Sequence, residues 1–163
     1  TETGLTEGKH CSVCNEILVA QEVVDALGHE WKGLECTRCG ETRENPFTDV
    51  PEEEYYFEPV LWAVENGITD GVSDNEFAPD DTCTRGQVVT FLWRAKGKVA
   101  PTKTESPFTD VQDQAEYYYN PVLWAVENGI TDGVEDDLFG YDQSCTRGQV
   151  VTFLYRNENV QAD

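Results

Sequence analysis

The sequence predicts a mainly α-helical fold, in which two helix–loop–helix repeats pack as a pseudo-symmetric bundle behind a small cysteine-rich β unit. The first observation is a duplication: residues 59–72 return letter for letter as 121–134, and residues 83–94 return as 145–156 with one change. A period of about 60 residues indicates two copies of one structural unit. The second observation is that apolar residues in each copy recur at helical spacing. The third is that four of the six cysteines precede the duplication.

The first helix of each repeat is expected after a Phe-Thr-Asp-Val turn, at residues 47–50 in the first copy. Tyr56, Val60 and Val64 then recur at helical spacing and would face the core. Pro59 must lie in the first turn, where its missing N–H costs little. An Asn-Gly pair ends the helix, because glycine suits the left-handed position after a helix.

The second helix of each repeat follows an acidic loop of about 15 residues, which Phe77 and its copy Phe139 are expected to pin. Thr84 and Gln87 match a capping box, in which two reciprocal side-chain bonds start a helix. The same pattern returns 62 residues later, at 146–149. Neither helix of a repeat can bury its apolar face alone, so the repeats must pack on each other.

These features divide the chain into five segments: a cysteine-rich metal-binding unit at 1–45, the first repeat at 46–98, a linker at 99–106, the second repeat at 107–158 and a tail at 159–163. The linker is polar and contains proline, so it can span a distance without strain. The chain begins at Thr1 without a signal peptide, which suggests a fragment of a larger protein.

The charge balance restricts the partners of the protein. The chain has 32 acidic and 11 basic residues, a net charge of −21. This balance excludes nucleic acid as a partner, because a polyanion would be repelled. No apolar run is long enough for membrane insertion. Calcium would need six to eight oxygens in a constrained loop, and the EF-hand spacing is absent, so solvated acidic turns are the simpler interpretation of the loops.

The repeats resemble the S-layer homology (SLH) family of bacterial surface modules. The resemblance lies in the order of motifs: Phe-Thr-Asp-Val, a helix ending in Gly-Ile, a Gly, Phe-x-Pro in the first copy, then Thr-Arg-Gly-Gln at the second helix. It implies noncatalytic anchoring of an exported protein at the cell wall or S-layer of a Gram-positive bacterium. The implied ligand is an anionic secondary cell-wall polysaccharide, often pyruvylated, bound in grooves between repeats.

The resemblance also implies which residues bind the glycan. The arginine of the capping motif is a typical contact, and a guanidinium can hold a carboxylate through two hydrogen bonds. An ion pair with a loop carboxylate is the alternative role for this arginine. The two tryptophans could stack on sugars or belong to the core, and Trp62 is the better candidate because it faces away from the apolar stripe. The candidate residues are Arg85, Arg147, Asp70, Gly71, Asp132, Gly133, Trp62 and Trp124.

The sequence departs from the family pattern in two respects. The usual capping motif is Thr-Arg-Ala-Glu, whereas Gly86 and Gln87 stand here, so a charge is lost and the first helical turn is weakened. The family normally uses three repeats, and only two are present. Self-association with another chain is one way to complete the third repeat position.

The N-terminal cysteines form two CxxC pairs, Cys11 with Cys14 and Cys36 with Cys39. Four thiolates can close a tetrahedral structural zinc site, as in a zinc-ribbon-like unit, and the metal would supply folding energy that 40 residues lack. Disulfides are the alternative, since an exported chain meets oxidising conditions. His29 is a substitute ligand. The segment between the pairs reads as one strand or two short strands.

Cys83 and Cys145 occupy equivalent positions before the two capping boxes. They would pair as a disulfide only if both lay beside the pseudo-symmetry axis; otherwise each is a small apolar residue. The sequence is compatible with three functions for the whole chain. Wall anchoring leads, and a structural stalk or self-assembly segment is the alternative. An enzyme, such as a glycosidase, is disfavoured because nothing singles out an acid–base pair.

Overall fold

The structure is a computed structural model that describes residues 2–159, so Thr1 and most of the expected tail, residues 160–163, lie outside the described residues. The chain divides into two compact units, Thr1–Asn45 and Pro46–Asp163. The first unit contains the N-terminal cysteine pairs, and the second contains both repeats.

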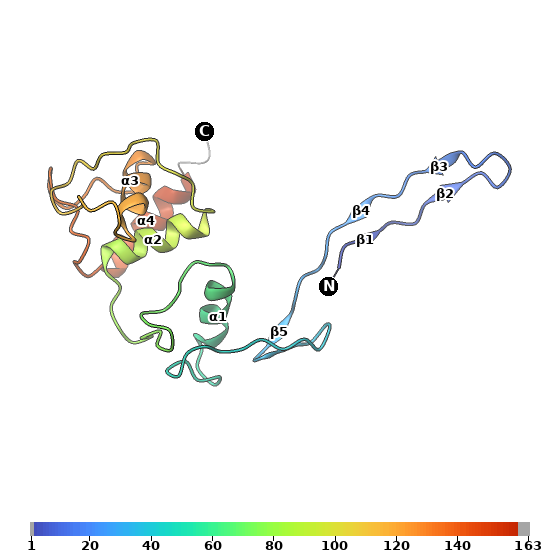
Figure 1. Ribbon diagram of the computed structural model, residues 1–163, viewed down its shortest axis with the longest axis horizontal. Coiled ribbons are helices and arrows are strands. Elements are labelled where there is room, and N and C mark those ends of the chain that lie inside the picture. The colour runs from blue at the N-terminus through green and yellow to red at the C-terminus, as the bar shows by residue number, and fades with distance from the viewer. Residues whose placement is uncertain (1, 160–163) are drawn as a thin grey trace. The chain divides into compact units, whose positions relative to one another are not determined.

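In the part of the first unit that the structure describes, three two-stranded antiparallel sheets pair β1 with β4 and β2 with β3 (Figure 1), and β5 with β6. Most of its residues are exposed, several are half-buried, and Cys36 is the buried residue within the described part of this unit. Residues 17–24, where one strand or two short strands were expected, form the two short strands β3 and β4. The strands are β1 (Gly4–Leu5), β2 (Lys9–His10), β3 (Ile17–Val19), β4 (Val23–Val24), β5 (Trp31–Lys32) and β6 (Glu35–Cys36).

The two CxxC segments adopt the same tight turn. The N–H of Gly40 donates to the carbonyl of Cys36 at 2.9 Å, and the N–H of Asn15 donates to the carbonyl of Cys11 at the same distance. Gly40 and Asn15 both have positive φ, at 74° and 60°. Asparagine tolerates this left-handed conformation better than most residues with a side chain. Both pairs therefore have the turn expected of a metal-binding knuckle.

The described part of the second unit has four helices, two in each repeat: α1 (Phe57–Glu65), α2 (Arg85–Ala95), α3 (Tyr119–Glu127) and α4 (Arg147–Asn159) (Figure 1). The first helix of each repeat holds its proline in the first turn. The capping box of α2 forms as predicted: the N–H of Gln87 donates to Thr84 Oγ1, and the N–H of Thr84 donates to Gln87 Oε1.

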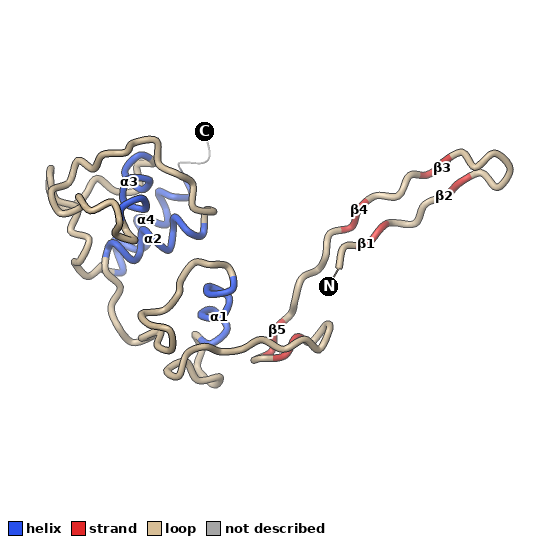
Figure 2. Tube along the Cα trace, in the orientation of Figure 1, coloured by secondary structure: helices blue, strands red, loops and turns tan. Residues whose placement is uncertain are grey.

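The prediction of a mainly α-helical fold is wrong. Only 26% of the residues are helical, and the remainder is mostly loop, with six short strands in three small sheets (Figure 2). The helices are short because glycine after Asn66 or Asn128 ends the first helix of each repeat after nine residues. A long ordered loop then precedes each second helix, and the first unit contributes strands but no helix within its described residues.

The expected symmetric packing of two equivalent repeats is also not observed. Helix α2 of the first repeat packs against α3 and α4 of the second repeat. The main core joins Val88 and Val89 of α2 to the buried residues of the second repeat, including Phe108, Val122 and Phe139. The buried residues of α1 are not members of this core cluster among the described residues. The first repeat therefore gives its second helix to the core of the second repeat.

The close approach of α2 to the second repeat depends on Gly86. Its N–H donates to the carbonyl of Tyr141 at 2.9 Å, and a Cβ at this position would lie 3.1 Å from the same oxygen. The equivalent Gly148 has only Thr146 Oγ1 nearby, at 3.9 Å. Gly86 therefore lies at the interface between the repeats, whereas the equivalent Gly148 has no close neighbour from another element.

The predicted linker lies along the second repeat instead of spanning free solvent. Glu127 Oε2 accepts from the N–H of Thr102 at 2.8 Å, and Trp93 Nε1 donates to the carbonyl of Val99 at 2.7 Å. Trp93 is the position at which the two copies of the capping segment differ, with Tyr155 as its equivalent.

Candidate functional site

Each repeat carries a groove between its acidic loop and its second helix. The first groove has a volume of about 560 Å³ and is lined by Thr69, Asp70, Gly71 and Arg94, among others. The second groove has a volume of about 500 Å³ and is lined by the equivalent positions: Thr131, Asp132, Gly133 and Arg156. The two grooves are therefore copies of one feature, and their differences arise from what the neighbouring repeat adds.

The acidic loop of each groove is held by the aspartate of the Phe-Thr-Asp-Val turn. The carboxylate of Asp49 accepts from the N–H groups of Phe77 and Ala78, at 2.9 and 2.7 Å. The carboxylate of Asp110 accepts from the N–H groups of Phe139 and Gly140 at the same two distances. These hydrogen bonds, the first of them to Phe77, lower the pKa of Asp49 despite the opposing effect of burial. The aspartates thus fix the loop walls.

The expected loop pins also form. Phe139 is fully buried and its ring centroid lies 5.5 Å from that of Phe108. Phe77 lies 5.6 Å from Phe47 in the same way. These ring contacts, together with the hydrogen bonds of the aspartate, hold each acidic loop against the Phe-Thr-Asp-Val turn of its own repeat.

Arg85 lines the second groove although it belongs to the first repeat. It is the first residue of α2, and its side chain crosses to the loop of the second repeat. Nε donates to the carbonyl of Phe139 at 3.1 Å, and Nη2 donates to Thr131 Oγ1 at 3.1 Å. The guanidinium lies over the rings of Phe139 and Phe153, at 5.1 and 5.2 Å from their centroids.

Arg85 is a buried cation without a paired carboxylate. The residue is only 2% exposed, and no carboxylate of the described chain forms an ion pair with it. Burial lowers its pKa, while the charges of Cys145 and Asp110 oppose this effect. An arginine stays protonated even so, and burying an uncompensated charge is costly. The second groove therefore offers a positive charge that an anion could neutralise.

The other arginine of each groove comes from the same turn of the second helix. Arg94 donates to the carbonyl of Ile68 at 3.3 Å and forms an ion pair with Asp70 at 2.8 Å. Arg156 donates to the carbonyl of Ile130 at 3.1 Å, but within the described residues it forms no ion pair with Asp132. Arg94 is therefore neutralised by its own groove, whereas Arg156 is not.

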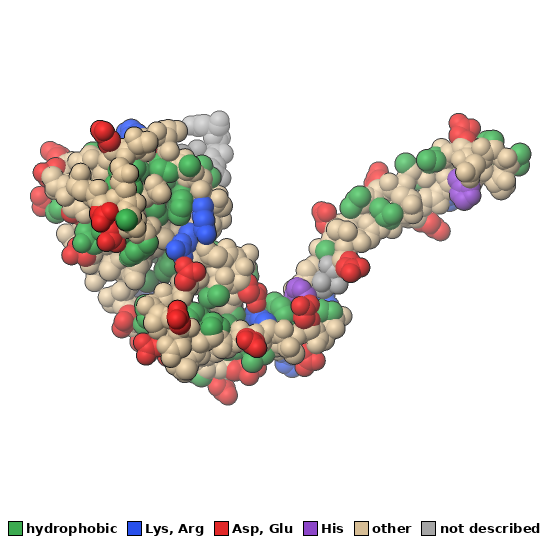
Figure 3. Space-filling view, in the orientation of Figure 1, with side chains coloured by type: hydrophobic (Ala, Val, Ile, Leu, Met, Phe, Trp, Pro, Cys, Tyr) green, Lys and Arg blue, Asp and Glu red, His purple; other side chains and the backbone are tan. Residues whose placement is uncertain are grey.

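The two grooves consequently differ in charge. The second groove is lined by Arg85, Arg156 and one carboxylate, that of Asp132. The first groove is lined by Arg94 and two carboxylates, those of Asp70 and Asp81. Acidic side chains outnumber basic ones on the face shown in Figure 3, whereas the lining of the second groove contains two arginines and one carboxylate.

The two glycines predicted for the grooves have structural reasons to be there. Gly71 and Gly133 have φ values of 80° and 97°, which residues with a side chain rarely adopt. A Cβ on Gly133 would lie 2.7 Å from the carbonyl of Leu138 and 2.8 Å from the ring of Phe108. A Cβ on Gly71 would meet Phe47 at 2.5 Å. Glycine at both positions therefore allows the loop that forms the groove wall to pack against the Phe-Thr-Asp-Val turn.

The remaining predicted residues lie outside the grooves. Arg147 is exposed and makes no hydrogen bond or ion pair that the described residues supply. Trp124 is 4% exposed and belongs to the main core, whereas Trp62 on α1 is 55% exposed. Neither tryptophan lines either groove. The sequence motifs did not single out Arg156 as a groove residue, and only its hydrogen bond to the Ile130 carbonyl reveals its place there.

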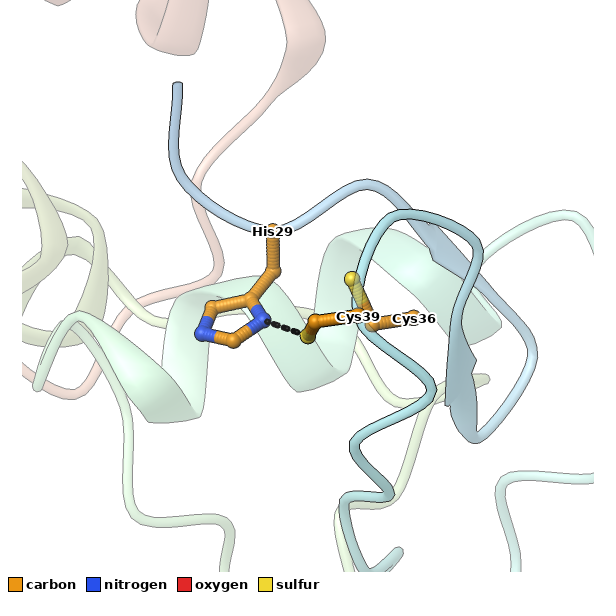
Figure 4. A group of neighbouring side chains, drawn as sticks. All are labelled: His29, Cys36 and Cys39. Carbon is orange, nitrogen blue, oxygen red and sulfur yellow. Dashed lines mark hydrogen bonds between the residues drawn. The ribbon is translucent and has the colours of Figure 1, made fainter. Parts of the chain in front are cut away.

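The first unit holds a cluster of potential metal ligands: His29, Cys36 and Cys39 (Figure 4). Their ligand atoms all lie within 4.8 Å of one another, and Nδ1 of His29 is 3.5 Å from Sγ of Cys39. Cys11 and Cys14 lie in the turn between β2 and β3 and do not join this group. The expected single site of four cysteines is therefore not formed, and His29 takes part instead.

The surroundings of this cluster favour metal-ligating forms. Burial raises the pKa of the Cys36 thiol, but hydrogen bonds from the backbone of Glu30, Arg38 and Cys39 outweigh it and bring the pKa to about 6. A thiolate is the form that binds metals. The Nε2 of His29 lies 3.7 Å from Oε2 of Glu41, and the same oxygen lies 4.0 Å from Sγ of Cys39. A carboxylate at this position commonly orients a histidine that binds a metal.

None of the helices in the described part of the chain has the length and apolarity that crossing a bilayer requires. The acidic loop residues do not come together as a cluster of metal ligands within the described residues.

Comparisons with known proteins agree with the repeat pattern. The S-layer homology domain pattern matches residues 46–89 and 107–151, more than half of the chain. A cell surface protein of Thermoanaerobacter kivui is 31% identical over 115 residues, which are 68% of this chain and 15% of that protein. An endoglucanase of Bacillus sp. (strain KSM-635) is 30% identical over 111 residues, 68% of this chain and 11% of the enzyme.

A surface-layer 125 kDa protein of Lysinibacillus sphaericus is 33% identical over 89 residues, 55% of this chain and 8% of that protein. The chain thus spans about a tenth of the length of the relatives that it matches. The similarity therefore concerns the repeats that these large proteins share, and the activities of the whole proteins do not transfer with it.

Proposed function

The chain belongs to the S-layer homology family and is a noncatalytic, extracellular module of the cell surface, and from this premise we propose that it anchors its protein by binding an anionic cell-wall polysaccharide in the second groove. The observation that carries the proposal is Arg85: a buried guanidinium lines an open groove without a carboxylate partner among the described residues. A carboxylate-bearing sugar, such as a pyruvylated residue, supplies the missing negative charge.

Two further features support this ligand. Arg156 adds a second positive charge that no described carboxylate pairs with. Two arginines can hold one carboxylate through several charge-assisted hydrogen bonds. Their local charge must outweigh the repulsion from a protein of net charge −21, and salt screens that repulsion at distances beyond about 8 Å under physiological conditions. We therefore expect binding to weaken at low ionic strength, where the overall repulsion reaches further.

The matched position Arg147 bears on self-association. It occupies in the second repeat the place that Arg85 occupies in the first, but it has no partner among the described residues. A further repeat, from another part of the protein or from a second copy, would receive Arg147 as the second repeat receives Arg85. The first groove would likewise accept an arginine from such a repeat beside Thr69 and the Phe77 loop.

The test is sedimentation of the full chain with purified cell walls that carry the secondary polymer, with walls stripped of it, and with walls whose pyruvate ketals have been removed. We expect pelleting only with the intact polymer. Arg85→Ala and Arg156→Ala should each weaken binding by about 10-fold or more, as loss of one charged hydrogen-bonding group does. Arg94→Ala and Arg147→Ala are the matched controls and should bind as the unchanged protein does.

Arg85 also contributes to packing between the repeats, so its variant must be shown to unfold at a temperature near that of the unchanged chain. Arg156 is exposed and therefore provides the independent variant if Arg85→Ala does not fold. Equal pelleting with intact and stripped walls would reject glycan binding and favour the alternative, a stalk or self-assembly segment. Concentration-dependent oligomers in analytical ultracentrifugation would then support that alternative.

For the first unit, we propose that His29, Cys36 and Cys39 hold one zinc ion. The set of two thiolates and one imidazole matches the ligands that zinc prefers, and such a site leaves the fourth position to water or another ligand. The metal would stabilise a unit in which most residues are exposed. Without a large core, metal binding is a sufficient source of folding energy.

The zinc proposal is tested by metal analysis of protein purified without chelator. We expect one zinc per chain, which Cys36→Ser and His29→Ala remove and which Cys11→Ser retains. The thiols of Cys36 and Cys39 should be reduced in the zinc-loaded protein. Loss of zinc in Cys11→Ser as well would instead support a four-cysteine site, and a Cys36–Cys39 disulfide without metal would reject the proposal.

A further inference from the structure

The two repeats meet in a short antiparallel contact just before their capping boxes. Thr84 and Ser144 form an isolated antiparallel bridge. The N–H of Arg85 donates to the carbonyl of Gln143 at 2.9 Å, and the N–H of Cys145 donates to the carbonyl of Cys83 at 2.9 Å. The contact places Cys83 directly opposite Cys145, one position beyond the bridged pair.

The side chains of this contact alternate between two faces, as in any extended pair of strands. The hydroxyls of Thr82 and Ser144 lie 3.4 Å apart on one face. The opposed cysteines must then lie together on the other face. Directly opposite residues in a hydrogen-bonded antiparallel pair have Cα atoms about 5.5 Å apart, which falls within the usual range for disulfides.

We propose that Cys83 and Cys145 form a disulfide that joins the two repeats covalently once the protein is at the cell surface. Both cysteines are free thiols in this structure; Cys83 is exposed and Cys145 is half-buried. Burial raises the pKa of the Cys145 thiol, and the nearby charge of Cys83 adds to this effect, whereas Arg85 opposes it. An extracellular module meets oxidising conditions in which such a bond persists.

The oxidant is a low-molecular-weight disulfide such as oxidised glutathione. The thiolate of exposed Cys83 attacks one sulfur of the oxidant, which forms a mixed disulfide and releases one glutathione thiolate. The thiol of Cys145 then loses its proton and attacks the Cys83 sulfur, which releases the second glutathione. In total the protein loses two protons and two electrons, and one oxidised glutathione becomes two reduced molecules.

The cross-link would act on the contact that assembles the second groove. Cys83 immediately precedes the cap of α2, and Cys145 immediately precedes the cap of α4. The bond would close a loop of about 60 residues, and constraining a loop of that length disfavours the unfolded chain. It would therefore hold Arg85 in the second groove when the chain is under load.

The test is peptide mapping of the full chain after equilibration with a glutathione redox buffer under native conditions. We expect one cross-linked peptide pair that contains Cys83 and Cys145, a mass loss of two hydrogen atoms, and a higher melting temperature than that of the reduced protein. Cys83→Ser should abolish the cross-link and the rise in melting temperature. Separate glutathione adducts on the two cysteines, with no cross-link, would overturn the proposal.

A register variant separates true adjacency from chance pairing. Cys145→Ser combined with Ser144→Cys moves the second thiol to the opposite face of the contact, where it faces Thr82. Cross-linking should then fall by at least 10-fold in rate. A cross-link that forms as fast in this variant as in the unchanged chain would show that the segment is too mobile for the register to matter, and would also reject the proposal.

Discussion

Alanine substitution of the two equivalent glycines should have opposite effects on stability. Replacing a helical glycine by alanine contributes about 0.5–1 kcal/mol, because the unfolded chain loses freedom and the helix gains propensity. At Gly148 the new methyl group meets only Thr146 Oγ1 at 3.9 Å, so Gly148→Ala should raise the free energy of unfolding by about that amount. The substitution does not change the contacts of the folded protein at this position.

At Gly86 the methyl group would lie 3.1 Å from the carbonyl oxygen of Tyr141 and 3.4 Å from Cβ of Tyr118. Both atoms belong to the second repeat, and overpacking of this kind costs about 1–3 kcal/mol. The hydrogen bond from Gly86 N–H to Tyr141 would lengthen as α2 moves away. We therefore expect Gly86→Ala to be less stable than Gly148→Ala by about 1–3 kcal/mol.

The assay is urea unfolding of both variants and the unchanged chain, followed by circular dichroism and tryptophan fluorescence under reducing conditions. Reduction keeps the proposed disulfide from contributing. An equal gain in stability from the two substitutions would refute the reasoning, because it would mean that α2 does not press against the second repeat as described.

Three further predictions follow from single residues. Trp124→Ala should lower the free energy of unfolding by about 3–5 kcal/mol, because the side chain is buried in the main core. Trp62→Ala should change the free energy of unfolding by less than about 0.5 kcal/mol. Urea titration measures both effects. The folded-state pKa of Asp49 is lowered below its usual value near 3.8, so its contribution is fully present above that value and is lost as pH falls through the folded pKa. An acid melting series should show this loss, and Asp49→Asn should flatten it. Burial raises the pKa of Cys83, so its oxidation by glutathione disulfide should accelerate between about pH 7 and 9, and a rate independent of pH would contradict this.

The local structure of the repeats could be predicted from the sequence because short-range chemistry determines it. The capping box at Thr84 and Gln87 forms within four residues, and glycine after Asn66 ends α1 wherever the helix lies. The period of about 60 residues established two copies, and the order of their motifs established the family. The turn at each CxxC pair was equally local, since it depends on a left-handed residue after the second cysteine.

The sequence overestimated the helical content because periodicity identifies helices but not the length of the ordered loops between them. It also predicted equivalent repeats, since equal letters suggest equal environments. Identical residues nevertheless lie in different environments when only one of the two repeats has a neighbouring repeat at the surface in question. Arg85 is buried against the loop of the second repeat, whereas Arg147 is exposed.

The sequence by itself determined the repeat, the caps, the acidic charge and the family. Only the tertiary structure decided which arginines share a groove, which histidine joins which cysteines, and which equivalent cysteines lie opposite each other. The physical reason is that these pairings join residues distant in the chain: 54 positions separate Arg85 from its acceptor at Phe139. No local propensity encodes such a distance, and the packing of α2 on the second repeat is what brings the two together.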